Sequence, residues 1–223
     1  YYGMQIPKEG FDPRRGTTPK GAGGPDMFGY KWIDSDEPGG PIFEWNDISG
    51  TGTEVTGFSD DNHVGPFPIG FSFDFYGQEF TEFYIQSNGT INFADEYISF
   101  SNQPIPTADA PNNFLAWFWD DLNPTVSGQV FYQTVGNQLI IQYLNYSEYG
   151  GNGGTVDAQV VISASGQITY YYNSFKNDMD LVGCTVGIEN GDGTDGLEVV
   201  LNAEYLHDGL AVRFSAESAW LSE

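Results

Sequence analysis

Hydrophobic and polar residues alternate over short segments along most of the chain. In Ile69–Tyr76, the residues Phe71, Phe73 and Phe75 fall at every second position, which places three aromatic rings on one face. A period of two is typical of a β-strand with one buried face. Related patterns predict further strands over residues 80–86, 90–93, 114–119, 129–134, 138–144, 156–162, 167–172, 184–189, 197–201 and 210–214.

Turn-forming residues separate these segments. Ser87-Asn88-Gly89 contains the Asn-Gly pair that favours tight hairpins, and Val135-Gly136-Asn137 and Ala164-Ser165-Gly166 separate two further pairs of strands. Strands that recur about every 8–12 residues with such turns are typical of a sandwich or a jelly roll. We therefore predict an all-β fold, an antiparallel β-sandwich of jelly-roll type, formed as one domain by residues 26–223.

Two segments indicate positions that are buried from both sides. Phe114–Trp119 is apolar without interruption, as expected of a strand that is covered on both faces. Cys184 is the only cysteine, and it lies in the β-like run Val182–Val186. Free cysteine is among the most buried residue types, so we expect a structural thiol there and not a reactive one.

Charge is distributed unevenly, although the net charge of the chain is −24. Residues 1–25 contain four basic and two acidic residues, a balance of +4 − 2 = +2, so residues 26–223 carry −24 − 2 = −26. The first segment is also rich in glycine and proline and lacks hydrophobic periodicity, which is typical of an extended arm. We predict a basic N-terminal arm, residues 1–25, joined to an acidic body.

An arm of this kind suggests self-association. If it adds a strand to a sheet edge of a neighbouring copy, backbone hydrogen bonds and opposite charges act together. Head-to-tail contacts of this type do not close and therefore give filaments. The residues that we expect to bind the partner are Tyr1, Tyr2, Met4, Ile6, Lys8, Arg14, Arg15 and Lys20.

The acidic composition also limits the other partners. Neutralising the phosphates of a nucleic acid requires many basic side chains, and the chain has seven, so nucleic acid is excluded as a partner. No apolar stretch approaches the roughly 20 residues of a transmembrane helix. Divalent cations and basic protein segments are what a strongly negative field attracts.

Five segments carry a resemblance to a known family, residues 69–77, 84–89, 116–124, 186–197 and 207–214. Together they resemble a domain that recurs in bacterial extracellular proteins, beside secreted peptidases and in surface proteins, and that is distantly similar to the nidogen-like domain. The similarity spans about residues 26–214. The resemblance implies an extracellular β-sandwich module without catalytic activity.

Acidic turns are the main candidates for chemistry. Residues 34–37, 60–62, 120–123, 177–180 and 190–195 each place several oxygen ligands on a turn, and calcium takes six to eight oxygens. The alternative is that these segments are solvated turns. The calcium ligands that we predict are Asp192, Asp195, Asp120, Asp121, Asp178 and Asp180; no other cofactor is expected.

Catalysis finds little support in the sequence. His63 and His207 are the only histidines, and His207-Asp208 lacks a nucleophile in a recognisable setting such as Gly-x-Ser-x-Gly. Adjacent residues of a strand face opposite sides, which argues against Asp120 and Asp121 as a catalytic pair. We therefore predict that the chain is not an enzyme.

Two functions remain open. The first is an extracellular structural or adhesive subunit of a surface assembly or filament, joined through the arm. The second is an accessory module of a larger secreted enzyme that binds calcium or polysaccharide. Tyrosines at 143, 146, 149 and 170–172 could form a platform for sugar rings, although packing within the sandwich explains them better.

Overall fold

The computed structural model describes residues 21–97, 99–110, 112–150 and 153–216, and within these ranges the chain forms strands, turns and loops but no helix. No segment of the described residues therefore forms a long apolar helix of the kind that crosses a bilayer. The strands are β1 (Ala22–Gly23), β2 (Tyr30–Asp34), β3 (Thr53–Val55), β4 (His63–Phe75), β5 (Gln78–Gln86), β6 (Thr90–Asn92), β7 (Phe114–Trp119), β8 (Gln129–Val135), β9 (Gln138–Ser147), β10 (Thr155–Ser163), β11 (Ile168–Lys176), β12 (Thr185–Glu189), β13 (Gly196–Leu201) and β14 (Leu210–Ala216).

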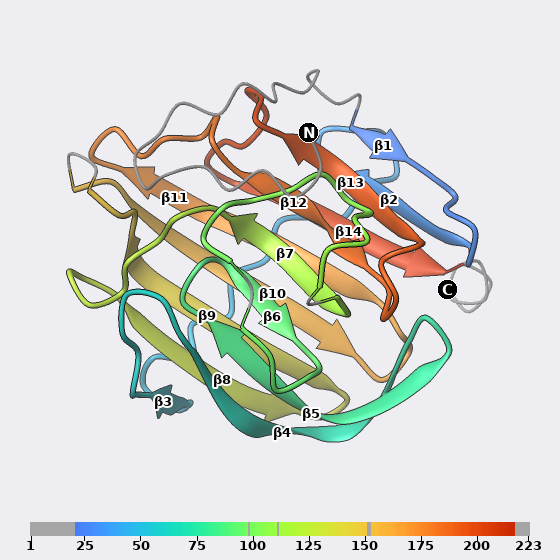
Figure 1. The fold of residues 1–223 in the computed structure, drawn as a ribbon, viewed down its shortest axis with the longest axis horizontal. Coiled ribbons are helices and arrows are strands. Elements are labelled where there is room, and N and C mark those ends of the chain that lie inside the picture. The colour runs from blue at the N-terminus through green and yellow to red at the C-terminus, as the bar shows by residue number, and fades with distance from the viewer. Residues whose placement is uncertain (1–20, 98, 111, 151–152, 217–223) are drawn as a thin grey trace.

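The strands form two antiparallel sheets that pack face to face (Figure 1). The larger sheet has the order β1-β2-β14-β11-β10-β9-β8-β3, and the smaller has the order β13-β12-β7-β6-β5-β4. This arrangement confirms the predicted antiparallel β-sandwich. Every strand predicted from the periodicity coincides with an observed strand, and the structure adds β1, β2, β3 and the first half of β4.

Three buried tyrosines of the larger sheet connect it to the smaller one. Tyr146 on β9 and Tyr170 and Tyr172 on β11 have no exposed surface. Their hydroxyls cross the core and donate hydrogen bonds to the backbone carbonyls of Ser87, Gly187 and Trp117, respectively. A buried tyrosine hydroxyl needs a partner, so these bonds fix how the two sheets lie relative to each other.

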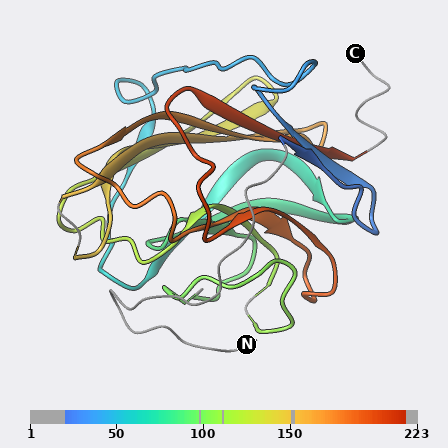
Figure 2. The same ribbon diagram turned by 90° about the horizontal axis from the view of Figure 1, so that it is seen from above.

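Irregular segments cover the outer faces of both sheets, so that the molecule has more layers than two (Figure 2). Ile48, in the segment 41–52, packs on Phe131 and Ile140 of the larger sheet. Ile105, in the segment 93–113, packs on Phe114, Ala116 and Trp119 of β7. All six side chains of β7 are therefore buried, which confirms the expectation for this apolar run.

The cover over the smaller sheet, residues 93–113, is held by two glutamates. Glu189 on β12 is fully buried, and its Oε2 accepts a hydrogen bond from the Thr107 backbone N–H at 2.6 Å. Glu198 on β13 accepts from the Ile105 N–H at 3.0 Å. Burial raises the pKa of Glu189 to about 8, because a low-dielectric environment disfavours the carboxylate.

The predicted arm falls mostly on residues 1–20, which lie outside the described residues. Tyr1, Tyr2, Met4, Ile6, Lys8, Arg14, Arg15 and Lys20 belong to that part of the chain. Directly after it, Ala22 and Gly23 pair with Ile33 and Trp32 as the edge strand of the larger sheet. The final part of the segment assigned to the arm is thus integrated into the body.

Replacing Glu189 with glutamine should flatten the pH dependence of stability. The folded protein binds the Glu189 proton up to a pH of about 8, whereas the unfolded chain releases it near its ordinary pKa of 4.5. The wild type should therefore lose about 4 kcal/mol of unfolding free energy through this group as the pH rises between these values. Urea denaturation of both proteins from pH 5 to pH 9 measures the difference.

The matched control is Glu82→Gln, because Glu82 is exposed on β5. Glutamine at position 189 can still accept the hydrogen bond from Thr107, so the variant should fold. Parallel pH profiles for the wild type and Glu189→Gln would contradict the assignment.

Candidate functional site

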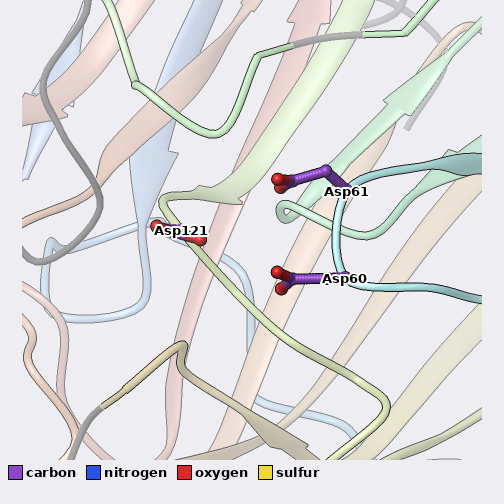
Figure 3. Close-up of side chains that lie close together, drawn as sticks. All are labelled: Asp60, Asp61 and Asp121. Carbon is purple, nitrogen blue, oxygen red and sulfur yellow. The ribbon is translucent and has the colours of Figure 1, made fainter.

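Three aspartates converge at one end of the sandwich. Asp60 and Asp61 lie between β3 and β4, and Asp121 lies two residues after the end of β7 (Figure 3). One carboxylate oxygen from each residue lies within 4.8 Å of the others. Oδ1 of Asp60 and both carboxylate oxygens of Asp121 are buried, whereas the Asp61 side chain is exposed. Negative charge is thus concentrated in a site that is only partly open to water.

The buried side chain of Asn88 holds these segments together. Its Oδ1 accepts a hydrogen bond from the Leu122 N–H at 2.9 Å, which fixes the chain after β7. Its Nδ2 donates to Asp61 Oδ1 at 3.0 Å and to the Tyr97 hydroxyl at 3.1 Å. Asn88 is fully buried, so the amide group connects three separate segments without competition from water.

The turn that carries Asn88 requires glycine at its next position. Gly89 has a φ of 73°, and a Cβ there would lie 1.7 Å from the Phe118 carbonyl oxygen. The backbone N–H groups of both Trp117 and Phe118 donate to the Gly89 carbonyl, which makes a bulge at the end of β7. The bulge turns the chain out of the sheet just before Asp120 and Asp121.

A second group of carboxylates lies beside the first. Asp120 Oδ2 and Asp180 Oδ2 lie 3.1 and 3.4 Å from the point where Gly183 would carry a Cβ, so they are close to each other. Glu148 accepts a hydrogen bond from the Asp180 N–H at 3.0 Å. The pKa of Asp120 is raised to about 7, mainly by burial and in smaller part by the negative charges of Asp180, Asp121 and Glu148.

The predicted calcium ligands are therefore divided between two places. Asp120, Asp121 and Asp180 lie at the end of the sandwich just described, and Asp178 lies in the same turn as Asp180 but belongs to neither carboxylate group. Asp192 and Asp195 follow β12, which runs antiparallel to β7 and pairs Glu189 with Phe114. They lie beyond the opposite end of β7, about 20 Å away for a strand of six residues.

Asp192 and Asp195 have structural partners in the described residues. Asp195 accepts hydrogen bonds from the Met27 and Phe28 N–H groups at 3.1 and 2.8 Å, which fixes the β1–β2 turn. Asp192 is exposed and accepts from the Thr194 hydroxyl and N–H, as in a self-contained turn. A single ion cannot use these residues together with Asp121.

The histidines lie apart from each other and from the buried thiol. His207 Nε2 lies 3.0 Å from Asp36 Oδ2, and His63 Nε2 lies 2.8 Å from Asp95 Oδ1. Asp208 uses its carboxylate to accept the Phe175 N–H instead. Cys184 is fully buried, and burial raises the pKa of its thiol, which agrees with the predicted structural role.

The tyrosines do not form an exposed platform in the part of the chain that the structure describes. Tyr143, Tyr146, Tyr170 and Tyr172 are fully buried. Tyr171 lies on the outer face of the larger sheet and packs edge-on against Phe43, with ring centroids 5.8 Å apart. Packing within the sandwich therefore accounts for these residues. This agrees with the preference for packing over a sugar-binding platform that was drawn from the sequence.

The residues that organise the site cannot be identified from the sequence alone. Asp60 and Asp61 were recognised as an acidic turn but were not combined with Asp121, which is 60 positions further along. Asn88 was assigned only to a hairpin turn, and Glu148 was not considered. The motif Ser87-Asn88-Gly89 indicates a turn and gives no signal for the distant partners of Asn88, which are Asp61, Tyr97 and Leu122.

Comparisons with known proteins identify a family for this chain but no similar solved structure. A search of solved structures gave no match for this chain. The sequence profile described as NIDO related matches residues 42–208, a range that includes Asp60, Asp61, Asn88 and Asp121. Domains of this kind are generally non-enzymatic modules, and nidogen-like domains are generally extracellular. Because the match covers well over half of its length, this chain belongs to the NIDO-related family.

Proposed function

We propose that this chain is a non-catalytic extracellular structural or adhesive module whose loop end is stabilised by calcium. The observation that carries the proposal is the convergence of Asp60, Asp61 and Asp121 within 4.8 Å. Family membership supports the extracellular, non-enzymatic part.

The chemistry of the three carboxylates suits a hard divalent cation. Calcium prefers six to eight oxygen ligands and accepts carboxylates in one-oxygen or two-oxygen modes, with water completing the shell. Three carboxylates at this separation repel one another, most strongly where their oxygens are buried, and a doubly charged ion relieves that repulsion. The charge of −26 on residues 26–223 raises the local concentration of such ions.

Calcium should therefore raise the melting temperature of protein that has been treated with a chelator. At a calcium concentration of about 100 times Kd, binding adds about 2.7 kcal/mol, which corresponds to a rise of roughly 5–10 °C for a domain of this size. Differential scanning calorimetry with and without calcium measures the rise, and isothermal titration calorimetry measures the stoichiometry.

The variant Asp61→Asn tests the site directly. Asparagine can still accept the hydrogen bond from Asn88, so the variant should fold, but one of the three charges is lost and the calcium-dependent rise should shrink by more than half. The control Asp192→Asn changes an exposed aspartate at the opposite end and should leave the rise intact. An unchanged wild-type melting temperature, or equal responses in both variants, would refute the calcium site.

We further propose that copies assemble head to tail through the basic arm into a surface layer or filament. The opposite charges of residues 1–25 and 26–223 support this idea. The strand edges of the described body limit how an arm could add to it. Three of the four edge strands are poor partners: β1 has two residues, β3 has three, and β4 contains Pro66 and Pro68, which cannot donate backbone hydrogen bonds. The fourth edge, β13, has six residues and no proline, so strand pairing is expected there and charge attraction elsewhere.

Deleting residues 1–20, which leaves β1 in place, should convert assemblies to monomers. Sedimentation velocity at low and high salt measures the distribution, and high salt should also dissociate the wild type because it screens the attraction. The double variant Arg14→Glu with Arg15→Glu keeps the length of the arm and reverses part of its charge, so it should weaken assembly as well. If the assemblies persist after both changes, the arm is not the part of the chain that joins the copies.

The alternative, an accessory module of a larger secreted enzyme such as a peptidase, shares the calcium site. It predicts a monomer at every salt concentration, and the sedimentation experiment separates the two. Its polysaccharide-binding form has little support, because Tyr143, Tyr146, Tyr170 and Tyr172 are buried and cannot contact a sugar ring.

A further inference from the structure

Three reactive side chains meet at the ends of three neighbouring strands of the larger sheet. Lys176 ends β11, Asp157 lies near the start of β10, and Asn145 lies near the end of β9. Lys176 Nζ lies 2.6 Å from Asp157 Oδ2 and 3.0 Å from Asn145 Oδ1. The amine is thus held between a carboxylate and an amide carbonyl.

Irregular backbone geometry brings these three side chains into contact. The pairing of β10 with both of its neighbours shifts register next to Ala158, which marks a bulge around Asp157. Asn145 has a φ of 47°, a left-handed conformation that is uncommon for residues other than glycine. Bulges redirect side chains and are concentrated at functional positions.

Asp157 contacts both of the other residues. Its Oδ1 accepts the Asn145 N–H at 2.6 Å, and its Oδ2 accepts the Ser174 hydroxyl at 3.1 Å as well as Lys176 Nζ. The Asp157 side chain is 11% exposed, whereas the Lys176 side chain is 42% exposed. The carboxylate is therefore fixed in a protected position, and the opposite side of the amine is open to water.

We propose that Lys176 and Asn145 form an intramolecular isopeptide bond, with Asp157 as the proton carrier. Lys176 Nζ lies 3.0 Å from Asn145 Oδ1, so Cγ, the atom that the amine attacks, is one carbonyl bond further along and within about 4.2 Å. A small rotation of the amide would bring Nζ and Cγ to the roughly 3–3.5 Å at which an intramolecular reaction is strongly accelerated, with Asp157 within hydrogen-bond reach as the general acid–base. If Lys176 only formed an ion pair, Asp157 would be its sole necessary partner. The additional contact with the Asn145 carbonyl is what brings the amine to an electrophile.

The reaction balances without an oxidant or a cofactor. Asp157 takes a proton from the Lys176 ammonium, and the free amine attacks Cγ of Asn145. Asp157 returns the proton to Nδ2 as the Cγ–Nδ2 bond breaks. The second amine proton is also transferred to the leaving nitrogen, which departs as ammonium through the exposed side. The product amide keeps one N–H, and it can donate to Asp157.

The bond would connect β9 to β11 across β10. It would close a covalent loop from residue 145 to residue 176, and closing a loop restricts the unfolded chain as a disulfide does. The chain contains one cysteine and cannot form an internal disulfide. This cross-link would act independently of calcium and of the arm.

Mass spectrometry of the intact, aged wild-type protein tests the proposal. The mass should be lower than the sequence mass by one ammonia, and protease digestion should release a branched peptide that joins β9 to β11 through Lys176 and Asn145. A wild-type mass equal to the sequence mass would show that the contact is an ion pair only and would overturn the proposal.

Two variants separate the cross-link from a succinimide, which also loses ammonia. Lys176→Arg keeps the positive charge beside Asp157 but lacks the amine, so its mass should equal its sequence mass. Asp157→Asn should slow or abolish the loss of ammonia in protein that still shows the wild-type circular dichroism spectrum. If ammonia is still lost in Lys176→Arg, or if the wild type loses ammonia but yields no branched peptide, the proposal is overturned.

Discussion

The hydrogen bonds that cross the core from the larger sheet determine the positions of most other features. The Tyr146 hydroxyl binds the carbonyl of Ser87 and so fixes the β5–β6 turn against the aromatic interior. The next residue, Asn88, then lies where its amide can bind both Leu122 and Asp61. A buried tyrosine hydroxyl without a hydrogen-bond partner would lower the stability of the folded state. The relative placement of the sheets is therefore specified by polar groups as well as by apolar packing.

Polar side chains also position the segments that cover the outer faces of the two sheets. The described residues of the segments 41–52 and 93–113 lie outside the strands, so several of their backbone groups bond to side chains of the sheets below. Gln142 and Gln159 satisfy the first segment by bonding Ile48 and Asn46, and Glu189 and Glu198 satisfy the second. The larger sheet thus holds its cover with amides and the smaller sheet with carboxyl groups, so the attachment of the cover on the smaller sheet depends on pH.

The sequence predicted the strands where side-chain alternation is regular, as in Ile69–Phe75, and failed where backbone exceptions interrupt it. Gly65, Pro66 and Pro68 obscure the first half of β4, and β3 is too short to show a period. The acidic turns could be recognised one by one from their composition. Which turns meet could not be predicted, because only the strand order β7-β6-β5-β4 brings Asp60 and Asp61 near Asp121. Asp192 resembles a calcium ligand because its turn is rich in acidic residues and glycine. Its composition could not show that this turn lies at the opposite end of β7 from Asp121.

The burial of Cys184 determines how the molecule responds to oxidants and thiol reagents. A solitary thiol on the surface would couple copies to one another, or to small thiols, wherever oxidants are present. Here the sulfur is fully enclosed between the sheets, and it becomes reachable only when the sandwich opens. The folded protein is therefore inert toward thiol reagents, and the rate at which such a reagent labels it reports how often the whole domain unfolds.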